Sequence, residues 1–201
     1  MRRRPSNKGE SNSQLKQRII TAAQKLFVKK DYHNTTIHDI VEEAGVSIGA
    51  LYHYFASKEE LARHIHHSAV HEFLSRYERE VRSQPTTKKK IQAFTSLMFQ
   101  WAEDDPVMVE YLLYGRPKEI LEKSFSICSE EGLQAVMEIV QEGIQKGEIC
   151  PIEPFAAAAL ISGTIIRMIE LRLIGIVSYP LSQISNQIAE SIWRAINAKN
   201  F

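Results

Sequence analysis

Residues 36–55 read TIHDIVEEAGVSIGALYHYF, and this stretch predicts two short helices in succession. Each is preceded by a hydroxyl side chain that can cap it, Thr36 for the first helix and Ser47 for the second. Between them Gly45 follows Ala44, at the position where a left-handed backbone ends a helix at little cost. Two short helices joined by so tight a turn make a helix-turn-helix.

The second helix of the motif presents an exposed start and outer face. When a helix-turn-helix docks on DNA, the start of its second helix enters the major groove, where small side chains permit a close approach. The N–H groups at both helix N-termini suit phosphate oxygens. The residues at the start and outer face are Ser47, Ile48, Gly49, Ala50, Tyr52 and His53. A generic helical hairpin shares the glycine and the apolar faces, so this pattern alone leaves both interpretations open.

Apolar residues continue at helical spacing on both sides of the motif. Upstream, a helix is predicted to begin at Ser13; downstream, the capping box that starts at Ser57 opens a long helix to about Arg82. Further helices are predicted over residues 87–103, 106–114, 117–128, 129–147, 153–177 and 181–199. Alternating apolar and polar residues never run for more than a few positions. The predicted fold class is therefore all-α, a three-helix helix-turn-helix head joined to a larger helical body.

The charges are distributed unevenly along the chain. Residues 1–30 contain nine Lys and Arg and one acid, a net charge of +8, and the remaining 171 residues have a net charge of −7. We predict a flexible basic arm over 1–12, a helix-turn-helix domain over 13–58 and a ligand-binding and dimerisation domain over 59–201. A basic arm before a neutral-to-acidic body is typical of a polyanion-binding protein. A solvated leader that only aids solubility has the same composition.

The composition excludes several classes of protein. Hydrophobic residues make up 44% and charged residues 24% of the 201 residues, which excludes wholesale disorder. Cys128 and Cys150 lack the spacing of a metal site and fit a reducing cytosol. No apolar leader follows Met1, and the longest apolar stretch, 155–166, is too short to cross a bilayer. We therefore predict a soluble, cytoplasmic protein with no membrane partner.

Residues 14–61 contain about a dozen positions of a known pattern, in order and at the right spacing. The segments that match are Arg18–Phe27, Asp31-Tyr32, Thr35-Thr36-Ile37, Ile40-Val41, Ala44-Gly45-Val46-Ser47, Gly49, Leu51-Tyr52, Tyr54-Phe55 and Ser57–Leu61. Together they resemble the DNA-binding domain of the tetracycline-repressor (TetR) family. The resemblance implies a three-helix DNA-binding head, a larger ligand-binding body and a homodimer formed by the last two helices.

The same resemblance implies which head residues contact DNA. In that family the residue types at Thr36, Tyr52 and Lys58 contact backbone phosphates, and the outer face of the recognition helix reads bases. The predicted DNA-binding residues are Thr36, Ile37, His38, Ser47, Ile48, Gly49, Ala50, Tyr52, His53 and Lys58. The base-facing set lacks the Arg, Asn and Gln that make bidentate base contacts, so thymine-methyl contacts or DNA shape supply the specificity. Arg2–Arg4 either reach an adjacent minor groove or bind DNA non-specifically.

The body is rich in methionine and aromatic residues at helical spacing. Such residues are most often plain core, but together they also suit a pliable apolar chamber. The resemblance places effector pockets between the helices of about 87–177, with the long helix 58–82 as the lever that moves the heads. The predicted ligand-binding residues are Phe94, Leu97, Met98, Trp101, Tyr111, Leu112, Phe125, Met137, Ile165 and Met168.

The last two predicted helices each have an apolar stripe. Two adjacent stripes suit a four-helix contact around a twofold axis, although one such helix could instead be buried inside the monomer. The predicted dimer-interface residues are Ile169, Leu173, Ile184, Ile188, Ile192 and Trp193.

Four histidines lie on the long helix, at His64, His66, His67 and His71. Their spacing permits a transition-metal site or a pH-sensitive contact, but surface histidines on a long helix are more common. We predict no metal and no cofactor.

The predicted function is a ligand-responsive, DNA-binding transcription regulator, a dimeric repressor released from a palindromic operator by a small apolar or aromatic effector. Whether such a regulator represses or activates depends on where its operator lies, so an activator stays open. An enzyme is disfavoured because the sequence shows no nucleophile triad spacing, no glycine-rich phosphate loop and no metal signature. The alternative is an all-helical carrier or interaction protein without specific DNA binding, against which Tyr52, Lys58 and the basic arm argue.

Overall fold

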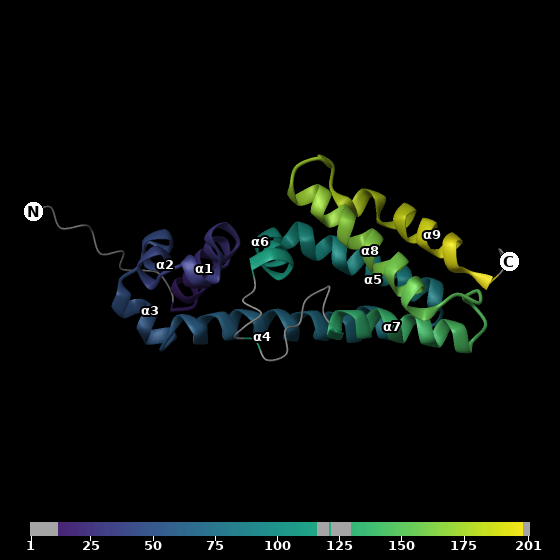
Figure 1. Ribbon diagram of the computed structural model, residues 1–201, viewed down its shortest axis with the longest axis horizontal. Coiled ribbons are helices and arrows are strands. Elements are labelled where there is room, and N and C mark those ends of the chain that lie inside the picture. The colour runs from purple at the N-terminus through teal and green to yellow at the C-terminus, as the bar shows by residue number, and fades with distance from the viewer. Residues whose placement is uncertain (1–11, 116–120, 122–129, 199–201) are drawn as a thin grey trace, which may run out of the picture.

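The computed structural model describes residues 12–115, 121 and 130–198. The predicted arm, apart from Asn12, lies outside these ranges, and so do Phe125 and almost all of the predicted helix 117–128. Within the described ranges every named element is a helix (Figure 1), which confirms the predicted all-α fold class.

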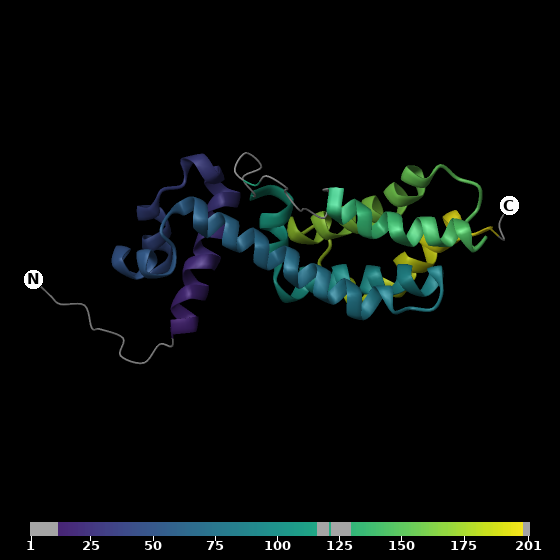
Figure 2. The same cartoon turned by 90° about the horizontal axis from the view of Figure 1, so that it is seen from below.

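The head and the body lie at opposite ends of the molecule. The head consists of α1 (Asn12–Asn34), α2 (Ile37–Ala44) and α3 (Ile48–Tyr54). The connection is α4 (Lys58–Arg76), which continues into the π-helical segment η1 (Tyr77–Arg82). The body consists of α5 (Thr87–Asp104), α6 (Pro106–Glu110), π-helical η2 (Tyr111–Gly115), α7 (Glu130–Gln145), α8 (Pro154–Leu173), 3-10 helical η3 (Leu181–Ile184) and α9 (Ser185–Ile196). Both views show α4 running from the head along the body (Figures 1 and 2).

Two helices near the C-terminus are shorter than the sequence predicts. The helix predicted to end at 177 ends at Leu173, and Gly175 then adopts a φ of 78°, in the left-handed region that favours glycine. The helix predicted to end at 199 ends at Ile196, because Asn197 enters an isolated antiparallel bridge with Ile149.

The apolar side chains of the head belong to one core that continues into the body. Phe27 of α1, Ile40 of α2 and Leu51 of α3 are all buried where the three helices meet. The helix-turn-helix is therefore rigid because each of its short helices buries an apolar side chain against α1, and neither depends on its own helix propensity.

α8 is strongly apolar along its whole length. It has 20 residues, long and apolar enough to cross a membrane by length and composition, although only 28% of its most apolar window is buried within the protomer. Helices that pack in soluble proteins pass the same test. α8 therefore leaves an apolar face that the protomer does not cover.

Candidate DNA-binding interface and effector chamber

The start of α2 is fixed by a reciprocal capping box. The Thr36 hydroxyl accepts a hydrogen bond from the Asp39 amide at 3.1 Å, and the Asp39 carboxylate accepts one from the Thr36 amide at 2.8 Å. Lys30 at the end of α1 pairs with the same carboxylate at 2.8 Å. The Lys30 ammonium, together with the Thr36 bonds, lowers the pKa of Asp39 well below its usual range. The carboxylate thus joins α1 to α2 while it caps α2.

Acid is expected to loosen this junction. Because the pKa of Asp39 is depressed in the folded state, its contribution to stability is present above the unfolded value near 4 and is lost as the pH falls below it. Asp39→Asn should lower the thermal midpoint at pH 7, and the difference from wild type should shrink in melts at pH 4 and below. Glu42→Gln, on the exposed side of the same helix, is the control. A difference that is unchanged by pH would contradict this role.

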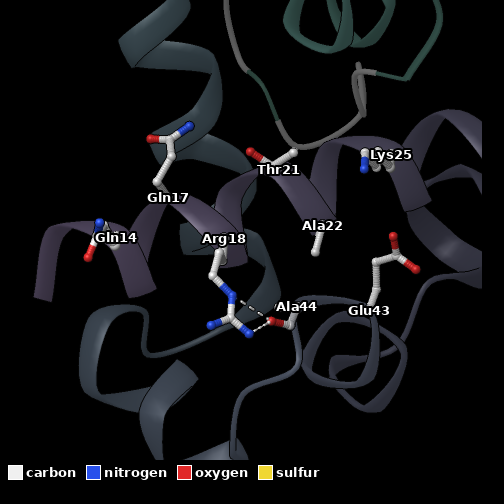
Figure 3. Close-up of a pocket in the computed structure, with 8 residues that line it drawn as sticks. All are labelled: Gln14, Gln17, Arg18, Thr21, Ala22, Lys25, Glu43 and Ala44. Atoms are coloured by element: carbon white, nitrogen blue, oxygen red, sulfur yellow. Dashed lines mark hydrogen bonds between the residues drawn. The ribbon is translucent and has the colours of Figure 1, made fainter. Parts of the chain in front are cut away.

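The turn of the helix-turn-helix is held from α1 by Arg18. Its guanidinium donates to the Ala44 carbonyl from Nε at 3.0 Å and from Nη2 at 2.5 Å, and to the Gly45 carbonyl at 3.1 Å. Figure 3 shows the Arg18 side chain reaching across from α1 to this carbonyl, inside an open hollow between α1 and α2. Gly45 has a φ of 64°, and a Cβ there would lie 2.8 Å from the guanidinium. This role of Arg18 was not predicted, although a charged residue on the apolar stripe between Leu15 and Ala22 is a sequence signal for a buried polar contact.

Arg18→Gln is expected to weaken DNA binding without removing a DNA contact. Hydrogen bonds from a charged donor contribute about 1.5–3 kcal/mol, so the thermal midpoint should fall and the angle between α2 and α3 should loosen. Operator affinity should drop about tenfold, since 1.4 kcal/mol corresponds to a factor of ten. Lys25→Gln, in the same hollow, is the control. If affinity falls while the thermal midpoint is unchanged, Arg18 touches DNA itself.

The recognition helix α3 turns the predicted base-facing residues to solvent. Ser47 caps it by accepting from the Ala50 amide at 3.1 Å, and Leu51 anchors its inner face. Tyr52 is 51% exposed, which leaves its hydroxyl available to a phosphate. The other exposed members of the predicted set are Thr36, His38, Ser47, Ile48, Gly49 and His53, whereas Ile37, Ala50 and Lys58 are half-buried. The structure therefore brings most of the predicted set onto one end of the head.

Lys58 already has protein partners. Its ammonium donates to the carbonyls of Tyr32 and Thr35, both at 2.7 Å, and lies 4.2 Å from the centre of the Tyr32 ring. Burial lowers the pKa of Lys58, and nearby Asp31 partly offsets this. Lys58 thus ties the start of α4 to the end of α1, and its contact with phosphate stays a prediction.

These features match known proteins. The family model described as "Bacterial regulatory proteins, tetR family" matches residues 19–65. The HTH-type transcriptional regulator YfiR of Bacillus subtilis is 30% identical over 150 residues, which cover 70% of this chain and 71% of YfiR. The chain belongs to the TetR family. It is a DNA-binding transcription regulator with a helical body that responds to a ligand.

Two comparisons extend through the body of this TetR-family chain. The fatty acid metabolism regulator protein of B. subtilis is 27% identical over 186 residues, covering 90% of this chain and 95% of that protein. The crystal structure of FadR from B. subtilis in complex with stearoyl-CoA has a TM-score of 0.67 and 26% identity, covering 88% of this chain and 96% of the FadR chain. The resemblance therefore includes the part that would bind a ligand.

Most of the predicted ligand-binding residues lie in the interior of the TetR-family body. The buried members are Phe94, Leu97, Met98, Trp101, Tyr111, Leu112 and Ile165, and the half-buried ones are Met137 and Met168. Phe125 lies outside the described residues. Their role in binding stays a prediction.

An aromatic stack at the end of α4 was not predicted. Phe73 stacks on Tyr77 with ring centres 5.9 Å apart, and on Trp101 of α5 at 6.3 Å. The Tyr77 hydroxyl donates to the Ala135 carbonyl of α7 at 2.7 Å. Burial is the main cause that raises the pKa of Tyr77. The stack joins α4 to α5 and α7, so the element that leads to the head forms part of the wall of the body.

The head meets the body where α1 packs on α6 and η2. The Gln24 amide donates to the Met108 sulfur at 3.2 Å, and the rings of Phe27 and Tyr111 lie 6.2 Å apart. Gly115 lies against α1, so closely that a Cβ there would be 2.8 Å from Cγ2 and 3.0 Å from the backbone nitrogen of Val28. The backbones of head and body can touch here only because residue 115 is glycine.

Gly115→Ala is expected to push η2 away from α1. Overpacking of this kind costs about 1–3 kcal/mol, measured by thermal or urea unfolding. Val28→Ala in the same chain removes the Cγ2 contact and should recover part of that loss. A double variant no more stable than Gly115→Ala alone would contradict this packing.

The predicted dimer stripe is partly internal. Ile169 and Ile192 are buried inside the protomer, which corrects their placement on a free surface, because that stripe of α8 and α9 faces the core. The other predicted residues, Leu173, Ile184, Ile188 and Trp193, are half-buried. The exposed residues of α8 are Phe155, Ala156, Ala159, Leu160, Gly163 and, one turn further on, the charged Arg167. The first five form a neighbouring apolar stripe. We call this the α8 outer stripe.

The histidines of α4 do not converge on a metal. His66 is buried, whereas His67 and His71 are exposed, and His64 packs 5.3 Å from the Phe55 ring. Among the described residues no group of three or more His, Cys, Asp or Glu is placed to hold a metal ion.

Proposed function

We propose that the chain is a homodimeric repressor that leaves a palindromic operator when its body binds a long-chain fatty acyl thioester. The observation that carries this proposal is the match to the fatty acid metabolism regulator of B. subtilis over 90% of the chain, through the body as well as the head. The solved FadR of the same organism has stearoyl-CoA bound.

The body of this chain suits an effector with a long apolar part. Phe94, Trp101 and Tyr111 are buried among aliphatic side chains of α5, α8 and η2, and Met98 adds a side chain that adapts to ligand shape. Small-molecule sites are lined mainly by hydrophobic and aromatic side chains, as this interior is. Phe73 of α4 stacks on Trp101 of α5, so an effector that separates α5 from α4 would move the head.

The α8 outer stripe is the proposed dimer interface. TetR-family regulators act as dimers. The stripe has the small residues Ala156, Ala159 and Gly163 beside the large apolar Phe155 and Leu160, all exposed in the protomer. A twofold axis through this stripe pairs it with itself and covers the apolar face that one protomer leaves open. Two heads in such a dimer can read half-sites about 34–36 Å apart.

The remaining predictions fit within this proposal. Residues 13–58 bind DNA, residues 59–201 bind the effector and the second protomer, and the protein acts in the cytoplasm without a catalytic step. The support is that the relatives are bacterial transcription regulators.

The test is binding of the purified chain to its own upstream DNA, measured by fluorescence anisotropy at several salt concentrations. Affinity should fall steeply with salt, because each phosphate contact releases counterions, and should exceed that for scrambled DNA. Stearoyl-CoA should then release the DNA, whereas coenzyme A alone should not. Tyr52→Ala should weaken binding to all sequences alike and leave stearoyl-CoA binding unchanged.

Each part of the proposal has its own contrary result. Stearoyl-CoA binding without any sequence-preferring DNA binding would favour the carrier alternative. Specific DNA binding that stearoyl-CoA leaves intact would exclude this effector class and keep the repressor.

A further inference from the structure

A second hollow, separate from the one around Arg18, lies where the head joins the body. It has a volume of about 320 Å³ and lies between α1, α4 and α6, which meet at this junction in Figure 1. Its lining residues are Ser13, Lys16, Gln17 and Ile20 of α1, His64, Ile65 and Ser68 of α4, and Met108 of α6. We call it the junction hollow. It is a different site from the chamber of the body, because none of these described lining residues belongs to the predicted ligand-binding set.

The inner side of the junction hollow is apolar. Ile65 is fully buried and Ile20 nearly so, and the half-buried Met108 has a side chain that adapts to the shape of a ligand. The Gln24 amide of α1 donates to the Met108 sulfur at 3.2 Å and so holds this side chain beside the head. A short apolar chain in the junction hollow would therefore leave water and contact three helices at once.

One end of the junction hollow is positively charged. The Lys16 ammonium lies 5.6 Å from the centre of the Phe55 ring, and the centre of the His64 ring lies 5.3 Å from the same point. Burial is the largest cause that lowers the pKa of His64, and the positive charge of Lys16 lowers it further. To a smaller extent Glu60 raises this pKa and His67 lowers it. Lys16 and His64 thus lie close enough for the charge of one to affect the other.

No acidic side chain is among the described residues that line the junction hollow. Glu60 lies one turn before His64 on α4, and its carboxylate accepts a hydrogen bond from the Ala56 amide at 2.7 Å. An ammonium and an imidazole offer N–H donors beside an apolar surface, and a carboxylate accepts from both. The junction hollow therefore suits a ligand with one carboxylate at the end of a short apolar chain, and its volume is near the lower end of the usual range for small-molecule sites.

We propose that the junction hollow binds a short-chain carboxylate. The chain of the ligand lies on Ile20, Ile65 and Met108. Its carboxylate lies between Lys16 and His64. This site is additional to the effector chamber of the proposed function. Because the bound molecule contacts the head, α4 and α6 together, it favours the arrangement of head and body in which the junction hollow exists, and operator affinity changes when the hollow is occupied.

The experiment is titration of the full chain with octanoate, measured by isothermal titration calorimetry with and without an excess of stearoyl-CoA. Octanoate should bind in both cases. Octan-1-ol, which has the same chain without the charge, should bind about tenfold more weakly, the effect of one charge-assisted hydrogen bond. Lys16→Gln should weaken octanoate binding by about the same factor. Lys29→Gln, at an exposed position of α1, is the matched control and should bind octanoate like wild type.

A variant that fills the junction hollow tests the same site without changing a charge. Ser68→Trp, at an exposed lining position, should abolish octanoate binding, and its thermal melt in the absence of octanoate shows that it folds. Octanoate should raise the thermal midpoint of wild type but not of Ser68→Trp, because a ligand of the folded state stabilises it. In wild type, bound octanoate should raise the pKa of His64 in an NMR titration, since a nearby negative charge favours the protonated ring.

Three results would overturn the proposal. Octanoate that stearoyl-CoA displaces, and that Lys16→Gln binds as tightly as wild type does, would lie in the chamber of the body instead. No binding of octanoate, or equal binding of octan-1-ol, would show that the junction hollow does not select a carboxylate. Operator affinity that saturating octanoate leaves unchanged would exclude the coupling of this site to the head.

Discussion

Leu160→Asp should convert the dimer to a monomer and lower operator affinity about 100-fold. Leu160 is 41% exposed on the α8 outer stripe, with Ala159 and Gly163 beside it. A second protomer seated there would bury the new carboxylate without a partner, which is strongly unfavourable. The loss in DNA affinity follows from multivalency, because linking two heads raises avidity by roughly 10²–10⁴ over one head.

The measurement pairs sedimentation equilibrium with operator titrations. Leu74→Asp is the matched control, since Leu74 is 49% exposed and belongs to α4, outside the α8 outer stripe. It should remain a dimer with wild-type affinity. A Leu160→Asp protein that sediments as a dimer would exclude the α8 outer stripe as the interface. A monomer that still binds the operator with full affinity would show that a single head is sufficient.

The helix-turn-helix could be predicted from the sequence because its signals are local. Thr36 and Ser47 cap helices within three residues of themselves, and Gly45 takes the left-handed conformation its position requires. Arg18 could not be predicted in the same way, because its partners lie 26 and 27 residues further along the chain. A contact between residues so far apart in the sequence depends on how α1 packs on α2. The spacing of apolar residues along the chain does not show that packing.

The sequence did not predict correctly which face of α8 packs against the core. The apolar residues of α8 cover more than one face. Both the core stripe through Ile165 and Ile169 and the outer stripe through Leu160 therefore show apolar residues at helical spacing. Only packing against α7 and α9 separates the two. The aromatic stack was missed for a related reason, since Phe73 and Tyr77 precede the segment in which the chamber was sought.

Phe73→Ala should cost about 3–5 kcal/mol of unfolding free energy, the usual loss for a buried phenylalanine that leaves a cavity. Phe73 is almost fully buried and stacks on both Tyr77 and Trp101, so the truncation removes both ring contacts and leaves a cavity. The thermal midpoint should fall by roughly 10 °C for a chain of this length, measured at fixed protomer concentration because dimerisation contributes.

The functional consequence of Phe73→Ala distinguishes a structural ring from one that transmits the effector signal. Phe73 stacks on rings of η1 and α5, whereas Ile40 and Leu51 are the buried residues of the helix-turn-helix, so operator affinity in the folded variant should stay within about twofold of wild type, a difference of roughly 0.4 kcal/mol. Stearoyl-CoA should release the DNA less completely, because α4 is no longer clamped to α5. Phe73→Leu refills most of the volume and should recover over half of the lost stability. Leu74→Ala, one residue along on the exposed face, should change neither property. Full effector response in a destabilised Phe73→Ala protein would show that the signal reaches the head by the contact of η2 with α1 instead.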